Sequence, residues 1–140
     1  MIVIAVSAIV TTIFVIAWAR RYVRERKLFS GRQVGWEAFA ESLAGQGWNG
    51  EAVRAVFDAL TEEGVDAGLA RAHDTLDLLG VVDEDLEDFV AIACRHAGVS
   101  IDDFEVLVDP KRGKLPLKTV ENLVRVLTSL QDQRRAVQES

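Results

Sequence analysis

Apolar residues recur along this chain in two patterns, one continuous run and several stripes at helical spacing. The continuous run extends over residues 2–19, which include no charged residue. After residue 35 the apolar positions instead recur every three or four residues, which is the spacing of one helix face. No segment alternates apolar and polar residues over a convincing length, so the pattern predicts an all-α protein.

The apolar run of residues 2–19 has the length of a membrane-spanning helix. Eighteen helical residues extend about 27 Å at about 1.5 Å each, which is close to the hydrocarbon thickness of a bilayer. Its few polar side chains include the hydroxyls of Thr11 and Thr12, which can bond to helix carbonyls one turn earlier. Trp18 lies at the end of the run, where aromatic rings favour the membrane interface. We therefore predict that residues 1–28 form a transmembrane anchor that ends in a basic juxtamembrane stretch.

The charges beside the run predict its orientation. Five basic residues follow it against Glu25 alone, a local balance of +4: Arg20, Arg21, Arg24, Arg26 and Lys27. A cleaved signal peptide carries its basic residues before the apolar run, so an uncleaved anchor is favoured despite the small residues of Ala17-Trp18-Ala19. The positive-inside rule then predicts a single-pass protein of the inner cell membrane, with its N-terminus outside and its C-terminal domain in the cytoplasm.

The rest of the chain is strongly acidic. The whole chain carries a net charge of −6, so the residues after Lys27 carry −10. Nucleic-acid phosphates would repel such a domain, and no basic stripe with interleaved aromatic residues offsets the charge. We therefore expect no nucleic-acid partner.

Residues that usually carry catalysis or bind metals are sparse. Cys94 is the only cysteine, which excludes an intramolecular disulfide and a thiolate-rich metal site, and its apolar surroundings favour a buried thiol. The two histidines, His73 and His96, have no neighbouring ligand pattern such as His-Glu-x-x-His. The sequence contains no recognisable nucleophile–base pair or glycine-rich phosphate loop. We therefore predict no enzymatic activity, no catalytic residue and no metal site.

The pattern of residues 29–48 predicts a connector followed by a short amphipathic helix. Trp36, Phe39 and Leu43 recur at three- and four-residue steps, and nearby glycines end the pattern. Trp48 follows in a loop. We expect the two tryptophans to pack this helix onto the main bundle, and a docking surface for a partner is the alternative.

The apolar pattern of residues 49–131 predicts the main helical domain. Asn49 is a good N-cap for its first helix, and Thr119 can cap its last. Between them, residues 65–75 lack a period, which indicates a long loop with one helical turn. The polar residues 132–140 predict a frayed tail.

The most informative helix of this domain follows Leu78-Leu79-Gly80. Leu86, Phe89 and Val90 recur at helical spacing, so one stripe can face a core. The first turns are instead crowded with acids, which unpaired N–H groups and the helix dipole favour there. These acids are Asp83, Glu84, Asp85, Glu87 and Asp88.

The order of these features, from Asn49 to about Leu130, resembles that of an acyl carrier protein. The likeness is carried by Asp77-Leu78-Leu79-Gly80 before the second helix, Leu86-Glu87-Asp88 along it, and Thr119-Val120-Glu121-Asn122-Leu123-Val124 in the last helix. The resemblance implies a small four-helix bundle, here preceded by one extra short helix. It also implies that the acidic second helix docks on a basic patch of a partner protein.

This chain departs from the family at the motif Asp-Leu-Gly-x-Asp-Ser-Leu, whose serine carries phosphopantetheine. Asp83 occupies the serine position without a gap, and Asp85 occupies it after a two-residue insertion. A carboxylate cannot form the required phosphodiester, so we expect no cofactor there. In a rival register, Gly98-Val99-Ser100-Ile101-Asp102-Asp103 resembles the end of the motif, and Ser100 would carry the group. Ser100 otherwise caps a short third helix.

The leading hypothesis is a membrane-anchored, non-enzymatic interaction module that docks a partner with a basic surface through these five acids. A helix start favours acids even without a partner, so a merely solvated face is the simpler alternative. Two other functions stay open. One is a working acyl or peptidyl carrier that uses phosphopantetheine on Ser100, and the other is a structural subunit whose transmembrane helix makes the essential contact.

Overall fold

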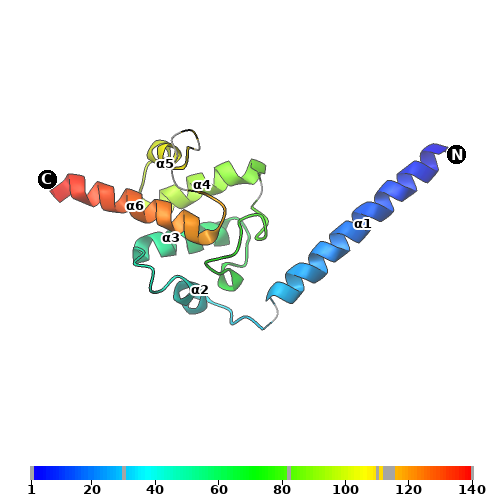
Figure 1. The fold of residues 1–140 in the computed structure, drawn as a ribbon, viewed down its shortest axis with the longest axis horizontal. Helices are drawn as coiled ribbons and strands as arrows, with labels where there is room; N and C mark the ends of the chain where they lie inside the picture. Colours follow the sequence, from blue (N-terminus) through cyan, green and yellow to red (C-terminus); the bar gives the residue numbers. More distant parts are fainter. Residues whose placement is uncertain (1, 30, 82, 110, 112–115, 140) are drawn as a thin grey trace. The chain divides into compact units, whose positions relative to one another are not determined.

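The computed structural model confirms the all-α prediction, since the residues that it describes form helices and no strand (Figure 1). It describes residues 2–29, 31–81, 83–109, 111 and 116–139, with residues 22–29 and 83 described by their backbone alone. The chain divides into two compact units, Met1–Arg32 and Gln33–Ser140. The elements are α1 (Ile2–Phe29), α2 (Trp36–Ser42), α3 (Gly50–Glu62), the 3-10 turn η1 (Ala67–Leu69), α4 (Asp83–Ala97), α5 (Ile101–Val108) and α6 (Val120–Glu139).

Helix α1, the first unit, is long and apolar enough to cross a membrane. Its segment Ile2–Arg21 has a mean hydropathy of 2.6, and all side chains of that segment are exposed. The hydroxyls of Thr11 and Thr12 donate to carbonyls one turn earlier, at 2.8 Å and 2.7 Å, as predicted. Each hydroxyl is thus satisfied within the helix, which lowers the cost of placing it in hydrocarbon. Three of the basic side chains used to predict orientation lie outside the described residues: Arg24, Arg26 and Lys27.

Aromatic contacts hold the short helix α2 on α3. Phe39 is fully buried, and its ring centroid lies 5.3 Å from that of Phe57 on α3. Trp36 meets the same Phe57 ring edge-on at 5.2 Å. Trp48, in the following loop, is half-buried, and the Arg125 guanidinium of α6 lies 5.4 Å from its ring centroid. The prediction that both tryptophans pack this segment onto the bundle is confirmed.

The segment between α3 and α4 contains the predicted helical turn as η1 and is fixed at two places. Gly68 lies so close to the chain before α2 that an added Cβ would be 2.7 Å from the Gly35 nitrogen. Further along, Thr75 and Thr119 form an isolated antiparallel bridge. The loop is therefore tied both to the start of α2 and to the start of α6.

The core of the second unit lies where α3 packs against α4 and α6 (Figure 1). Phe89 of α4, Leu60 of α3 and Leu123 of α6 have no exposed surface. Phe104 brings α5 onto the same core with 1% of its surface exposed. The apolar stripes read from the sequence therefore face one another, while the acids of α4 lie on its other side.

Side chains cap two helices as predicted. The Asn49 Oδ1 accepts a hydrogen bond from the Glu51 N–H at 2.9 Å, which caps α3. The Thr119 Oγ1 accepts from the Asn122 N–H at 3.2 Å, which caps α6. Ser100 does occupy the N-cap position of α5, but its side chain makes no capping hydrogen bond. The predicted capping role of the Ser100 hydroxyl is therefore wrong.

The last helix is longer than the sequence indicated. Residues 132–140 were expected to fray, yet α6 continues to Glu139. The Gln131 amide donates to the Ala97 carbonyl at 3.0 Å, and Arg134 donates to the Gly98 carbonyl, so both side chains tie α6 to the end of α4. Glutamine, arginine and glutamate also have good helix propensity, so polarity alone was a poor reason to expect fraying.

Candidate functional site

A tight turn delivers the chain to the acidic start of α4. The Val81 N–H donates to the Leu76 carbonyl at 2.9 Å, and the Gly80 N–H donates to the Asp77 carbonyl at 3.0 Å. Gly80 has a φ of +86°, a left-handed conformation that side-chain-bearing residues rarely adopt. Helix α4 then begins at Asp83, so the predicted docking acids occupy its first two turns.

Four of the five predicted carboxylates are exposed on these turns: Glu84, Asp85, Glu87 and Asp88. The side chain of Asp83 lies outside the described residues. Within the part of the chain that the structure describes, none of the four forms an ion pair or a side-chain hydrogen bond. The structure therefore gathers four unpaired carboxylates on one short stretch of helix, and their docking role stays a prediction.

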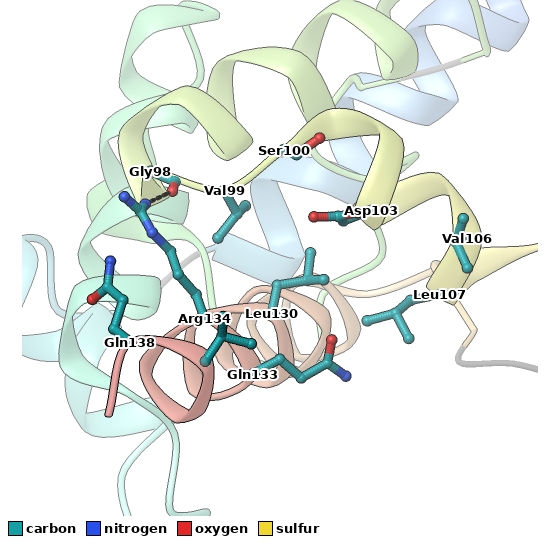
Figure 2. Close-up of a pocket in the computed structure, with 11 residues that line it drawn as sticks. Gly98, Val99, Ser100, Asp103, Val106, Leu107, Leu130, Gln133, Arg134 and Gln138 are labelled. Atoms are coloured by element: carbon teal, nitrogen blue, oxygen red, sulfur yellow. Dashed lines mark hydrogen bonds between the residues drawn. The ribbon is translucent and has the colours of Figure 1, made fainter. Parts of the chain in front are cut away.

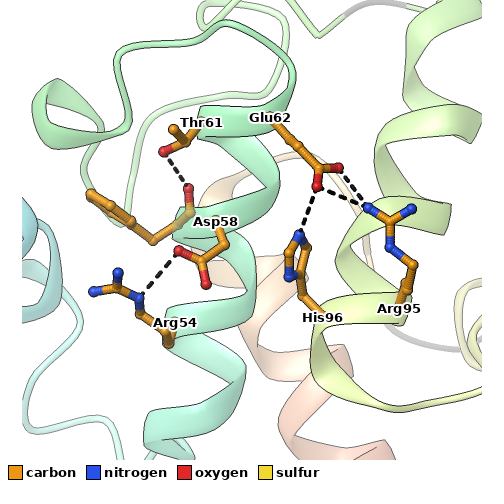
Figure 3. Close-up of polar contacts among 7 residues, drawn as sticks. Arg54, Asp58, Thr61, Glu62, Arg95 and His96 are labelled. Carbon is orange, nitrogen blue, oxygen red and sulfur yellow. Dashed lines mark hydrogen bonds and ion pairs between the residues drawn. The ribbon is translucent and has the colours of Figure 1, made fainter.

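Acids on the adjacent helix α3 are in a different situation (Figure 3). Glu62 accepts from the Arg95 guanidinium at 2.7 Å and lies 3.3 Å from the His96 Nε2 atom, both at the end of α4. Asp58 pairs with Arg54 one turn earlier at 3.2 Å. Each of these carboxylates thus has a cation beside it, and the Glu62 group also joins two helices.

An apolar pocket of about 340 Å³ lies beside the acidic start of α4. Leu86 belongs to both features, because it lines the pocket and stands between Asp85 and Glu87 in the sequence. The remaining lining residues are Thr75, Leu76, Asp77, Val81, Leu117 and Lys118. An apolar side chain of a partner could enter here while basic groups contact the acids.

A larger cleft of about 700 Å³ lies between α5 and the second half of α6 (Figure 2). Ser100 lies on its wall with an exposed side chain, and its hydroxyl has no hydrogen-bond partner among the described residues. The apolar lining is formed by Val99, Val106, Leu107, Leu130 and Val137. Sequence reasoning missed this cleft. The available signal was Val137, which continues the stripe of α6 seven residues after Leu130.

The remaining nucleophile is buried and protonated. Cys94 has 2% of its surface exposed, and burial, with a smaller contribution from the charge of Glu105, raises the pKa of its thiol to about 11. The thiolate is the reactive form, so Cys94 is inert at neutral pH and the predicted structural role fits. The described residues contain no group of three side chains able to hold a metal ion.

Comparison with known proteins identifies no relative of this chain. The chain matches no protein-family model, and no curated protein or solved structure is significantly similar to it. The likeness to acyl carrier proteins therefore stays a prediction from the residues quoted above. What the geometry itself offers is a set of exposed carboxylates beside an apolar pocket, which can bind a basic surface.

Proposed function

We propose that this protein is a membrane-anchored, acyl-carrier-like interaction module that docks a partner protein through the acidic start of α4. The observation that supports the proposal is that Glu84, Asp85, Glu87 and Asp88 are exposed and unpaired among the described residues, whereas Glu62 is paired. In this proposal α1 anchors the chain in the inner cell membrane, and the bundle holds its partner at the cytoplasmic surface.

The helix itself does not explain all of these acids. Its dipole favours negative charge within the first turn, which accounts for Glu84 and Asp85. Glu87 and Asp88 lie in the second turn, three residues after them, where neighbouring like charges destabilise a helix by about 0.2–0.5 kcal/mol per pair. A basic partner would remove this repulsion and use the charge for steering and orientation.

The carrier chemistry of the resembled family does not fit this turn. Asp83 and Asp85 hold the two alignments of the family serine, and neither offers a hydroxyl to which phosphopantetheine could be attached. The docking surface is therefore proposed to work without a prosthetic group and without a catalytic residue.

The docking proposal is tested by charge reversal in the full-length chain, cross-linked in its own membranes and purified with its partners. The double variant Asp85→Lys and Glu87→Lys should lower the recovery of a specific partner about tenfold, since each exposed ion pair contributes about 0.2–1 kcal/mol and reversal adds repulsion. The matched control is Glu37→Lys with Glu41→Lys, which makes the same charge change at exposed sites of α2. Equal recovery from both double variants would contradict docking through α4.

One observation favours a second function, an acyl or peptidyl carrier that uses Ser100. The Ser100 side chain is exposed on an apolar cleft and its hydroxyl makes no cap. The intact mass of the full-length chain from its own membranes separates the two functions. An unmodified mass that retains the N-terminal segment supports the docking module. A mass increased by phosphopantetheine, mapped to Ser100 and absent from Ser100→Ala, would establish the carrier instead.

The third function is that of a structural subunit. It differs from docking because α1, and not α4, would make the essential contact. If α1 makes the essential contact, moving the bundle onto an unrelated membrane anchor abolishes function. If α4 makes it, as we propose, the chimera retains its partner.

A further inference from the structure

A groove on α1 lies where the apolar run of this helix meets its basic end. Figure 1 shows α1 as one uninterrupted helix, so residues on both sides of this boundary share one helical register. The groove has a volume of about 470 Å³ and is lined by Ile13, Ile16, Ala17, Arg20 and Arg21. Apolar walls and two guanidinium groups therefore meet within three turns of helix.

We propose that this groove binds an anionic phospholipid, with an acyl chain along its apolar walls and the phosphate at Arg20 and Arg21. The proposal rests on the anchoring role of α1 in the proposed function, and not on docking by α4. The apolar run of residues 2–19 is long enough to fill the hydrocarbon layer, so the arginines that follow it lie at the level of the lipid phosphates. Ile13, Ile16 and Arg20 recur at steps of three and four residues, so one lipid can contact all three along a single helix face.

The charge at this boundary favours an anionic lipid over a zwitterionic one. Residues 20–27 carry five bases against Glu25 alone, a balance of +4. A zwitterionic headgroup carries its own cation beside the phosphate, whereas an anionic headgroup brings a net negative charge to such a cluster. Arg20 is exposed and forms no ion pair within the part of the chain that the structure describes, so its guanidinium is open to a phosphate. Arginine can bind a phosphate through two parallel N–H···O bonds.

The positions after the groove continue its face. By helical register, positions 24 and 27 lie on the same face as Arg20, and both are basic in the sequence. Position 25, which holds the one acid of the cluster, falls on a different face. A signal that only sets orientation in the membrane requires a number of positive charges and no particular face. The alignment of these bases with an apolar groove is instead what a bound anionic lipid requires.

Fluorescence quenching of the full-length chain in lipid vesicles tests this preference. The vesicles contain phosphatidylcholine and phosphatidylglycerol, with one or the other brominated near the glycerol end of its acyl chains. Bromine quenches nearby tryptophans, and Trp18 lies two residues before Arg20. The association constant from quenching of Trp18 should favour phosphatidylglycerol about fivefold, the effect of one favourable charge contact. A Trp18→Phe chain gives the signal of Trp36 and Trp48, which is subtracted. Equal constants for the two lipids would overturn the proposal.

Charge variants locate the preference on α1. Arg20→Gln with Arg21→Gln should lower it to less than about twofold, whereas Arg20→Lys with Arg21→Lys keeps the charge and should retain most of it. Lys111→Gln with Lys118→Gln removes the same charge at exposed sites outside α1 and should leave the preference unchanged. A preference that survives the Arg→Gln changes, or that the Lys→Gln changes abolish as well, would overturn the site.

Flotation of the same vesicles in a density gradient distinguishes a failure of this site from a failure of the anchor. A chain that does not float with the vesicles would overturn both the anchoring role of α1 and the lipid site. A chain that floats but shows no lipid preference would overturn the lipid site alone and leave docking through α4 unaffected. Flotation together with a preference for phosphatidylglycerol that depends on Arg20 and Arg21 is the expected result.

Discussion

Carboxylates on α3 and carboxylates at the start of α4 occupy the same kind of surface, a helix face beside the bundle. On α3, Asp58 lies 3.2 Å from Arg54, and Glu62 lies 2.7 Å from Arg95 across the helix interface. At the start of α4, Glu87 and its acidic neighbours have no such cation among the described residues. The difference shows that exposure alone does not leave a carboxylate unpaired, because Asp58 and Glu62 are also partly exposed.

Helix α4 makes this contrast within a single element. Its basic end, Arg95 and His96, contacts Glu62 and therefore contributes to the packing of α3 on α4. Its acidic start lies at the opposite end, where the described part of the chain offers no such contact. The two ends of α4 therefore differ: its basic end is paired with Glu62, and its acidic end, which has no such pair among the described residues, is the one that we propose docks a partner.

The largest predicted effect comes from removing a core side chain of α4, which weakens the packing of this helix on the bundle. Phe89→Ala removes a side chain with no exposed surface, so we expect the free energy of unfolding to fall by about 3–5 kcal/mol. The measurement is urea unfolding followed by far-ultraviolet circular dichroism. Glu87→Ala, on the exposed face of the same helix, should change stability by no more than about 0.5 kcal/mol. A loss below about 1 kcal/mol for Phe89→Ala would contradict the buried position.

The next effect sharpens the distinction between the two faces of α4. Burial raises the pKa of the Cys94 thiol from 9.0 to about 11, so at pH 8 the folded chain should hold about a hundredfold less thiolate than the unfolded chain. Alkylation by iodoacetamide should be slower by at least that factor than in urea. Between pH 9 and 11 the unfolded thiol loses its proton while the folded thiol keeps it, so stability should fall as the pH rises. The fall should be smaller in Cys94→Ala, and an equal fall would refute the assignment.

The smallest effect separates the paired acids from the unpaired ones. Glu62→Ala leaves Arg95 and His96 without their carboxylate, and we expect it to cost about 0.5–1 kcal/mol, because the group is partly exposed. Partner binding should not change. Glu87→Ala should show the reverse, with stability retained and binding weakened. Parallel unfolding and pull-down measurements check both variants, and similar behaviour of the two would remove the distinction.

Local signals accounted for much of the fold. Asn49 and Thr119 were predicted as caps because a capping hydrogen bond joins residues two or three positions apart. The turn at Gly80 and the acidic start of α4 were likewise readable from neighbouring residues. The failures were also local inferences: the hydroxyl of Ser100 caps nothing, and α6 continues to Glu139 because distant contacts support it.

By itself, the sequence determined the helical class, the apolar run long enough to span a membrane, and the surplus of acid on one helix. Each follows from periodicity, length or composition over one segment. Only the tertiary structure decided which acids are paired and where the open cleft lies. Glu62 and Arg95 are 33 positions apart, and Gly98 and Arg134 are 36 apart. Such contacts depend on how helices pack together, and no local pattern of residues encodes which charged side chains will then meet.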